Sequence, residues 1–327
     1  MLKKCLFYLL LVATVPTLAK STLIVYTYDS FSSEWGPGPT VKKAFESQCY
    51  CKLKFITLEN GVALLNRLRM EGNNSKADIV LGLDNNLLQA AQNTGLFAPH
   101  DIDNSVLTLP GGWHNTTFLP YDYGYFAFIY DKTKLKNPPH SLHELVNSPS
   151  TLKIIYEDPR TSTPGFGLLL WMNKIYGDEA PAAWQKLARK TITVTKGWGE
   201  AYGLFLKGEA DMVLSYTTSP VYHFIEKKKD QYAAAVFNEG HYQQVEVAAQ
   251  LKASKQQNLA HAFLQFMISP AFQQTIPTGN WMYPVISLEL PAGFDQPPPQ
   301  TLSFIPQQVA SGRAGWVEQW QRAVIRR

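Results

Sequence analysis

The sequence predicts an α/β protein of two lobes, each a mostly parallel sheet flanked by helices, with extended strands crossing between them. Three observations predict it. Short β-rich segments alternate with helical segments along most of the chain. These β-rich segments are largely apolar, as expected of strands that helices bury on both faces. Two stretches, Phe118–Tyr130 and Tyr232–Leu251, exceed the roughly five or six residues of an ordinary strand, so we expect them to be the crossings.

Composition excludes several classes of protein. The 327 residues are 45% apolar and 17% charged, which is typical of a folded globular chain long enough for two domains. A net charge of +4 is small for this length and gives no reason to expect nucleic-acid binding. Three cysteines are too few for a disulfide-dense scaffold or a cysteine zinc cluster.

The N-terminus has the pattern of a signal peptide. Met1–Lys4 is basic, Cys5–Val15 is apolar, and small residues at Thr17 and Ala19 predict cleavage after Ala19. A buried N-terminal strand is the alternative, and a lipoprotein is disfavoured because Cys5 precedes the apolar run. The exported chain keeps Cys49 and Cys51, which either form a tight disulfide or remain free thiols.

The first hundred residues alternate strand and helix three times. In order, we expect the strand Thr22–Thr27, the helix Thr40–Ser47, the strand Lys52–Leu58, a helix that Asn60 caps, the strand Asp78–Leu83, and a helix that Asp84 caps and Gly95 ends.

A second α/β set follows. It begins with the crossing Phe118–Tyr130, a helix opened by the capping box Ser141–Glu144, and the strand Lys153–Glu157. We then expect a helix from its N-cap Thr163 to Gly177, the strand Thr191–Thr195 and the helix Gly199–Lys207. The strand Asp211–Tyr216 and a helix from Ser219 complete the set. After the second crossing come the helices Gln257–Ile268 and Gly312–Ile325, with a proline-rich linker at Gln296–Gln300.

Candidate binding residues follow from this topology, because ligands of open α/β sheets bind beyond the carboxyl ends of the strands. Aromatic side chains at such ends can line a pocket and attract cations, although most aromatic residues pack in cores. The aromatic candidates are Tyr28, Trp35, Trp198, Tyr216, Tyr222 and Trp281.

Two hydroxyl-rich turns are further candidates. Thr161–Gly165 opens a helix, where free N–H groups and the added hydroxyls of Ser162 and Thr163 suit an anion or a polar ligand. Ser215–Pro220 places several hydroxyls at a strand-to-helix turn. Plain helix capping by Thr163 and Ser219 is the alternative in each case.

Carboxylates at the same edge can pair with a cationic ligand. They are Asp29, Glu59, Asp84 and Asp122. Asp84 is more simply explained as a helix cap, whereas Asp29 has no evident capping role. The chain shows no nucleophile elbow, phosphate-binding loop or zinc-protease motif, and its histidines lie singly except for the pair His140 and His143, so we expect neither a catalytic nor a metal site.

Several long segments carry a family resemblance. They are Val25–Ser30, Trp35–Pro39, Asn66–Gly72, Ala77–Asn86, Tyr121–Tyr125, Asp158–Gly165, Leu214–Pro220 and Pro277–Pro284. With them the sequence closely resembles the thiamine-binding periplasmic proteins of bacterial ABC importers, over nearly the whole mature chain and more weakly after Val285. The segments at Asp158 and Leu214 also resemble the wider group of iron- and polyamine-binding proteins.

The resemblance implies a type II periplasmic binding protein fold that closes on thiamine, thiamine monophosphate or thiamine diphosphate without any cofactor. The implied ligand contacts are Asn60, Gly61, Ser162, Thr163, Trp198, Tyr216, Thr217, Thr218 and Ser219, with Tyr28, Tyr222 and Trp281 as further pocket aromatics. The family has Asp-Gly where this chain has Asn60-Gly61, so one carboxylate is missing and Asp29 becomes the expected charge partner.

The resemblance also implies a periplasmic, monomeric carrier that delivers its ligand to a membrane permease with a cytoplasmic ATPase. We expect lobe 1 to comprise residues 20–124 and 241–327, and lobe 2 to comprise residues 125–240. Packing of the last helices on lobe 2 is the alternative. Two alternatives share the fold. A thiamine-degrading transferase uses a cleft cysteine, but Cys49 and Cys51 precede their strand; a ferric-iron carrier uses adjacent tyrosines, which this chain lacks.

Overall fold

The structure is a computed structural model that describes residues 20–294 and 298–325. The predicted signal peptide and part of the predicted linker Gln296–Gln300 lie outside these residues. No helix in the described ranges is long and apolar enough to span a bilayer.

The first lobe begins with three parallel strands, as the sequence predicts. They are β1 (Thr22–Tyr28), β2 (Lys52–Leu58) and β3 (Ile79–Asp84), with β1 between the other two. The helices between and beside them are α1 (Asp29–Ser32), α2 (Gly38–Cys49), α3 (Gly61–Glu71), the short 3-10 turn η1 (Gly72–Asn74) and α4 (Leu88–Gln92). Asn60 caps α3 as predicted, because its side chain accepts hydrogen bonds from the backbone N–H groups of Val62 and Ala63.

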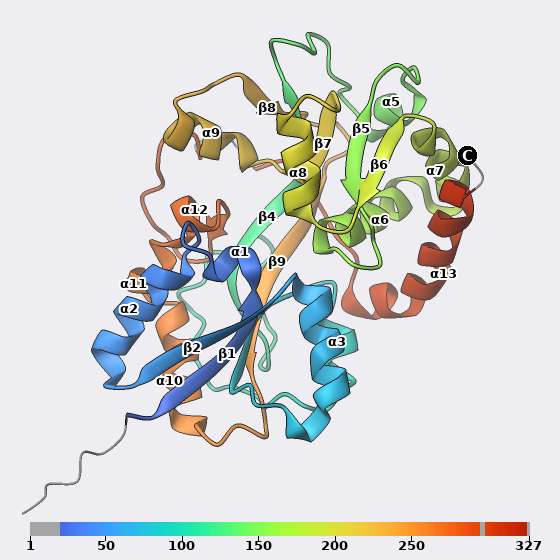
Figure 1. Cartoon of the computed structure of the whole chain (residues 1–327). Coiled ribbons are helices and arrows are strands. Elements are labelled where there is room, and N and C mark those ends of the chain that lie inside the picture. The colour runs from blue at the N-terminus through green and yellow to red at the C-terminus, as the bar shows by residue number, and fades with distance from the viewer. Residues whose placement is uncertain (1–19, 295–297, 326–327) are drawn as a thin grey trace, which may run out of the picture.

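Two long strands cross the middle of the molecule and join the lobes (Figure 1). They are β4 (Leu119–Asp131) and β9 (His241–Gln250), which pair antiparallel with Asp122 opposite Glu246. The first half of β4 pairs with β9, and its second half pairs with β7 (Met212–Tyr216) of the other lobe. Of the stretch Tyr232–Leu251, β9 makes the return crossing; a separate short strand, β8 (Tyr232–Ala234), pairs with the end of β4.

The second lobe repeats the parallel arrangement. Its strands β5 (Ile154–Glu157), β6 (Thr191–Thr195) and β7 are parallel, with β5 in the middle. Its helices are α5 (Leu142–Asn147), α6 (Thr163–Tyr176), the 3-10 turn η2 (Gly177–Glu179), α7 (Ala180–Ala188), α8 (Trp198–Leu206) and α9 (Ser219–Lys227). The path β2-β1-β3-β9-β4-β7-β5-β6 is therefore one mixed sheet that runs through both lobes.

The C-terminal segment returns along the first lobe and ends beside the second. It contains α10 (Gln257–Met267), α11 (Pro270–Gln273), α12 (Ile276–Gly279), β10 (Tyr283–Pro284), β11 (Thr301–Leu302) and α13 (Pro306–Ile325). Helix α13 packs on α6 and α7 and also contacts α4, so it touches elements from both halves of the chain (Figure 1).

Two of the predicted helix caps are wrong. Asp84 precedes α4 by several residues, and its carboxylate instead accepts from the N–H groups of Asn86 and Leu87 in the turn after β3. The N-cap of α6 is Ser162, whose hydroxyl accepts from Gly165, so Thr163 is the first helical residue. The helix predicted to start at Gly312 begins earlier, at Pro306.

A disulfide joins Cys49, at the end of α2, to Cys51, just before β2. It resolves the alternative that the spacing of the two cysteines left open. The bridge lies at the amino end of β2, whereas the predicted binding residues of the first lobe follow the carboxyl ends of β1 and β2.

Candidate functional site

A buried polar cluster lies where the crossing strands meet the end of β1. The hydroxyl of Tyr28 donates to Glu246 Oε2 at 2.7 Å, and the hydroxyl of Tyr121 lies 3.1 Å from the same oxygen. The amide of Asn280, in the turn after α12, donates to Glu246 Oε2 at 3.0 Å and to Asp122 Oδ2 at 2.6 Å. The cluster therefore draws on four separate parts of the chain.

Two buried carboxyl groups, those of Asp122 and Glu246, lie opposite each other in this cluster and both accept from Asn280. Burial, followed by the charge of Glu246, raises the pKa of Asp122 well above its usual range. Burial also raises the pKa of Glu246, but hydrogen bonds from Tyr28, Asp122, Tyr121 and Asn280 oppose that rise. Both groups therefore favour the protonated form more than an exposed carboxyl does, and the donors around Glu246 make it the more acidic of the two.

The second lobe contributes aromatic and hydroxyl side chains from the turn between β7 and α9. Tyr216 donates from its hydroxyl to Gln244 Oε1 at 2.8 Å, which ties the turn to the crossing strand β9. Trp198, the first residue of α8, donates from Nε1 to Ser215 Oγ at 2.8 Å. Ser215 and Ser219 hydroxyls lie 2.7 Å apart, so these hydroxyls hold the turn and the indole in place.

The rest of the same turn contacts the C-terminal segment. Thr218 donates from Oγ1 to the carbonyl oxygen of Trp281 at 2.6 Å, and Thr217 Oγ1 is buried without a hydrogen-bond partner in the described part of the chain. The Tyr222 and Trp281 rings meet edge to face, with their centroids 5.2 Å apart. Trp281 has φ of +57°, a left-handed conformation that is uncommon for a non-glycine residue.

The two lobes also touch at the N-termini of α3 and α6. Asn60 Nδ2 donates to the carbonyl oxygen of Thr161 at 2.6 Å, while its Oδ1 caps α3. Lys196 Nζ lies 2.8 Å from Glu59 Oε2. A Cβ on Gly61 would lie 2.5 Å from the Gly82 carbonyl oxygen, so only glycine fits there, and it would lie 3.5 Å from Thr163 Oγ1. These contacts describe lobes that are drawn together.

Most of the binding residues predicted from the sequence fall into these neighbouring groups. Tyr28 lies in the carboxyl cluster, Asn60 contacts Thr161, and Gly61 lies near Thr163 at the start of α6. Residues 216–219 form the turn between β7 and α9. The predicted aromatic residues Trp198, Tyr222 and Trp281 lie around that turn. Two candidates stand apart: Asp29 is exposed at the start of α1, and Trp35 is 59% exposed. Their roles in binding stay predictions.

Sequence reasoning missed the residues that complete the cluster. Glu246, Tyr121, Asn280 and Gln244 were not among the predicted binding residues, and Asp122 was named only as one of several carboxylates. Glu246 carried a detectable signal, because it is an acid between Val245 and Val247 in a strand whose residues are all buried. Asn280 carried none, since it reaches the cluster from a turn far along the chain.

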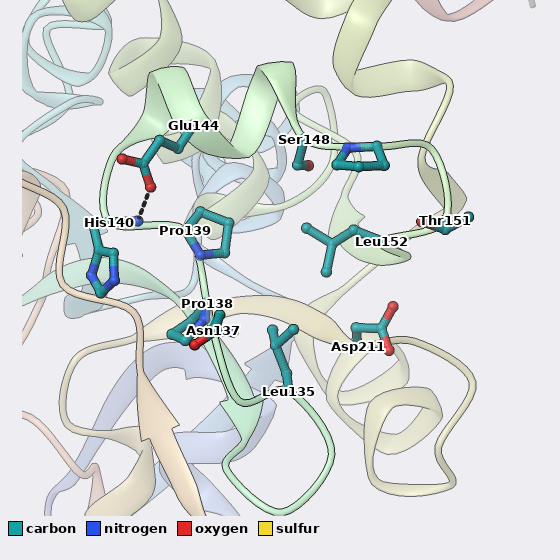
Figure 2. A pocket seen from close by; sticks show the side chains of 11 residues that line it. Leu135, Asn137, Pro138, Pro139, His140, Glu144, Ser148, Thr151, Leu152 and Asp211 are labelled. Carbon is teal, nitrogen blue, oxygen red and sulfur yellow. Dashed lines mark hydrogen bonds between the residues drawn. The ribbon is translucent and has the colours of Figure 1, made fainter.

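Two surface pockets lie elsewhere. One of about 550 Å³ is lined by Leu135, Pro138, Leu152 and Asp211 among others, at the outer end of the second lobe (Figure 2). Another of about 560 Å³ lies beside the Cys49–Cys51 disulfide. Neither contains a predicted binding residue, and no group of three or more His, Cys, Asp or Glu side chains in the described ranges is arranged to hold a metal ion.

Comparison with known proteins decides the family. The family model for bacterial extracellular solute-binding proteins matches residues 39–274. The chain belongs to this family. It is 68% identical to the thiamine-binding periplasmic protein of Escherichia coli over the full length of both chains, and 54% identical to that of Brucella suis over 94% of this chain and 93% of the relative.

Solved structures agree with the fold. A periplasmic thiamin binding protein superposes with a TM-score of 0.91 at 68% identity, over 93% of this chain and 96% of that one. A ferric binding protein from Campylobacter jejuni gives 0.77 at 20% identity, over 92% and 99%, which shows the fold alone. The predicted two-lobed type II periplasmic binding protein fold is therefore confirmed, and the family assignment makes the chain a binding protein, not an enzyme.

Proposed function

We propose that this protein captures thiamine and its phosphate esters between its lobes in the periplasm and hands them, unaltered, to the permease of an ABC importer with its cytoplasmic ATPase. The observation that carries the proposal is the 68% identity, over the whole chain, to a relative named as a thiamine-binding periplasmic protein. The type II binding fold suits a carrier whose two lobes close over a small molecule.

The chemistry of the site fits this ligand. Thiamine carries a permanently cationic thiazolium ring, which is attracted to aromatic faces and to carboxylates. Tyr28, Tyr216 and Trp198 supply the aromatic faces, and Glu246 supplies a carboxyl group that is not in an ion pair with any described residue. The aminopyrimidine ring needs donors and acceptors, which the hydroxyl and amide groups around Tyr216 provide.

A phosphate ester would extend toward the N-terminus of α6. The first N–H groups of a helix carry a partial positive charge and bind anions. Ser162 and Thr163 are buried at this helix start, and Thr163 Oγ1 lies next to Gly61 of the first lobe. Free thiamine and its mono- and diphosphate would then share the ring contacts and differ in their use of this helix end.

Delivery requires that the lobes separate again. The contacts that join them at the N-termini of α3 and α6 are one hydrogen bond from Asn60 and one exposed ion pair between Lys196 and Glu59. Exposed ion pairs contribute little to stability, so the Lys196–Glu59 pair can break at little cost. We propose that a monomer presents the closed shape to the permease.

Titration calorimetry of the purified protein with thiamine, thiamine monophosphate and thiamine diphosphate tests the proposal. We expect one ligand per chain, and chromatography of the released ligand should recover it intact. Failure of all three to bind would contradict the proposal, recovery of separated pyrimidine and thiazole fragments would favour the transferase, and tight binding of ferric iron alone would favour an iron carrier.

A further inference from the structure

Asp122 and Glu246 occupy an unusual position in the molecule. They face each other on the two crossing strands, in register, at the point where the chain passes between the lobes. Asp122 is fully buried and Glu246 is 8% exposed. Neither forms an ion pair with any lysine, arginine or histidine among the described residues, and Asp122 Oδ1 has no hydrogen-bond partner there.

The described groups next to the pair add no positive charge to it. Tyr28 faces it from β1, Tyr121 from β4 and Asn280 from the turn after α12. Asp84, at the end of β3, interacts electrostatically with Glu246, and Glu246, Asp122, Asp84 and Glu157 all act on Tyr216 of β7. Arg313 of α13 is a cation that acts on Asp84, not on the pair itself, in the described interactions. The centre of the molecule is thus rich in buried acid.

We infer that the Asp122–Glu246 pair is the counter-charge for the cationic ring of the ligand, and that binding of this ring expels the proton that the two carboxyl groups share. This inference rests on the proposed function. It assigns recognition of the ligand's positive charge to the crossing strands. From the sequence we had expected Asp29 to have this role.

Electrostatics gives the reason for the proton release. Without ligand, a second negative charge on the pair would be buried beside the first, which is costly, so the pair keeps one proton and one negative charge. A permanent cation close to the pair stabilises the doubly ionised form. The shared O–H bond of Asp122 then breaks, the proton passes to solvent, and both carboxylates face the cation.

The same arrangement gives selectivity. A neutral ring of the same shape would leave the pair singly ionised and would gain nothing from its charge. Cationic ligands are therefore favoured over neutral isosteres, and the preference should weaken as pH falls, because the proton must be removed against a higher proton concentration.

Calorimetry in buffers of different ionisation enthalpy tests this inference, because it counts the protons released. The probes are thiamine and its neutral thiophene isostere, at pH values from 5.5 to 8. For the wild type we expect release of up to one proton per thiamine, none with the isostere, and at least about tenfold tighter binding of thiamine.

Variants distinguish the pair from other acids. Asp122→Asn should abolish proton release. Glu246→Gln should reduce the preference for thiamine over the isostere at least about fivefold. The matched control is Asp131→Asn, the same change at the far end of β4, where the carboxylate bonds to Thr133 and Gln231 instead. It should behave as the wild type.

Several results would overturn the inference. One is binding of thiamine to the wild type without proton release. Another is an unchanged preference for thiamine over the isostere in Glu246→Gln. A third is loss of proton release in Asp84→Asn but not in Asp122→Asn. Binding of the isostere by each variant shows that it is folded and competent. If the wild type binds neither probe, the proposed function itself fails, which is a different outcome from binding both probes equally.

Discussion

The two sides of the lobe interface have different chemistry. The first lobe and the crossing strands bring the linked carboxyls of Asp122 and Glu246 with the hydroxyl of Tyr28. The second lobe brings mainly neutral groups, the indole of Trp198 and the hydroxyls of Ser215 and Ser219, on turns where strands lead into helices. The difference teaches that acidic groups lie on the long strands shared by both lobes, while the second lobe contributes mainly neutral donors and aromatic faces.

The largest effect should come from the aromatic side. Trp198→Ala or Tyr216→Ala removes a ring face and a hydrogen-bonded anchor, so we expect thiamine binding to weaken by about thirtyfold or more, corresponding to about 2 kcal/mol. Calorimetry measures the change, and thermal melting should show that both variants remain folded. Phe224→Ala, which truncates an exposed aromatic residue of α9, is the control. Unchanged affinity in the first two variants would remove them from the site.

Glu157 is an exception to the neutral character of the second lobe. It is fully buried at the end of β5, neither of its carboxyl oxygens has a hydrogen-bond partner in another described residue, and burial raises its pKa to about 8. The folded protein therefore holds a proton that the unfolded chain releases above about pH 4.5. Stability contributed by the neutral form is present at low pH and declines as pH rises toward about 8, by at most about 1.4 kcal/mol per pH unit.

Glu157→Gln removes this titration. We expect the free energy of unfolding to fall less steeply between pH 5 and pH 8 in the variant than in the wild type, so that the variant is the more stable of the two at pH 8. Urea denaturation at several pH values measures the difference. Parallel pH profiles for the two proteins would show that Glu157 is already ionised in the folded state.

Asn60 separates helix capping from lobe closure. Asn60→Ala loses both the cap of α3 and the bond to Thr161, and should cost about 1 kcal/mol of stability. Asn60→Asp keeps a capping oxygen and should cost less than about 0.5 kcal/mol, because aspartate caps as well as asparagine. Urea denaturation at pH 7 compares the two variants. Equal losses would show that the cap contributes nothing to the effect.

The smallest effect should come from the exposed ion pair across the lobes. Lys196→Ala removes the partner of Glu59, and we expect thiamine affinity to change less than about threefold, since exposed pairs are weak and screened by salt. Calorimetry at low and high salt measures it. A tenfold loss that persists at high salt would mean that Lys196 contacts the ligand directly.

Local patterns predicted most of the fold. Alternating strands and helices, the capping oxygen of Asn60 and the unusual length of Phe118–Tyr130 are properties of neighbouring residues, and the structure has each of them. Caps were wrong where several polar residues compete, as at Ser162 and Thr163, because the choice depends on the exact turn at which the helix begins.

The candidate site was less predictable. The residues that follow strands, such as Tyr28 and Tyr216, could be named because the strand ends are visible in the sequence. The carboxyl pair could not, because facing of Asp122 and Glu246 depends on the register of two strands more than a hundred residues apart. Asn280 joins them through a turn whose position no local pattern indicates.

A crystal structure of the protein with thiamine tests the central claim most directly. We expect one intact thiamine molecule between the lobes, with its rings against Trp198 and Tyr216 and its thiazolium ring facing Glu246. Thiamine bound on an outer surface, such as the pocket lined by Leu135 and Leu152, or a ligand cleaved between its two rings, would contradict the account.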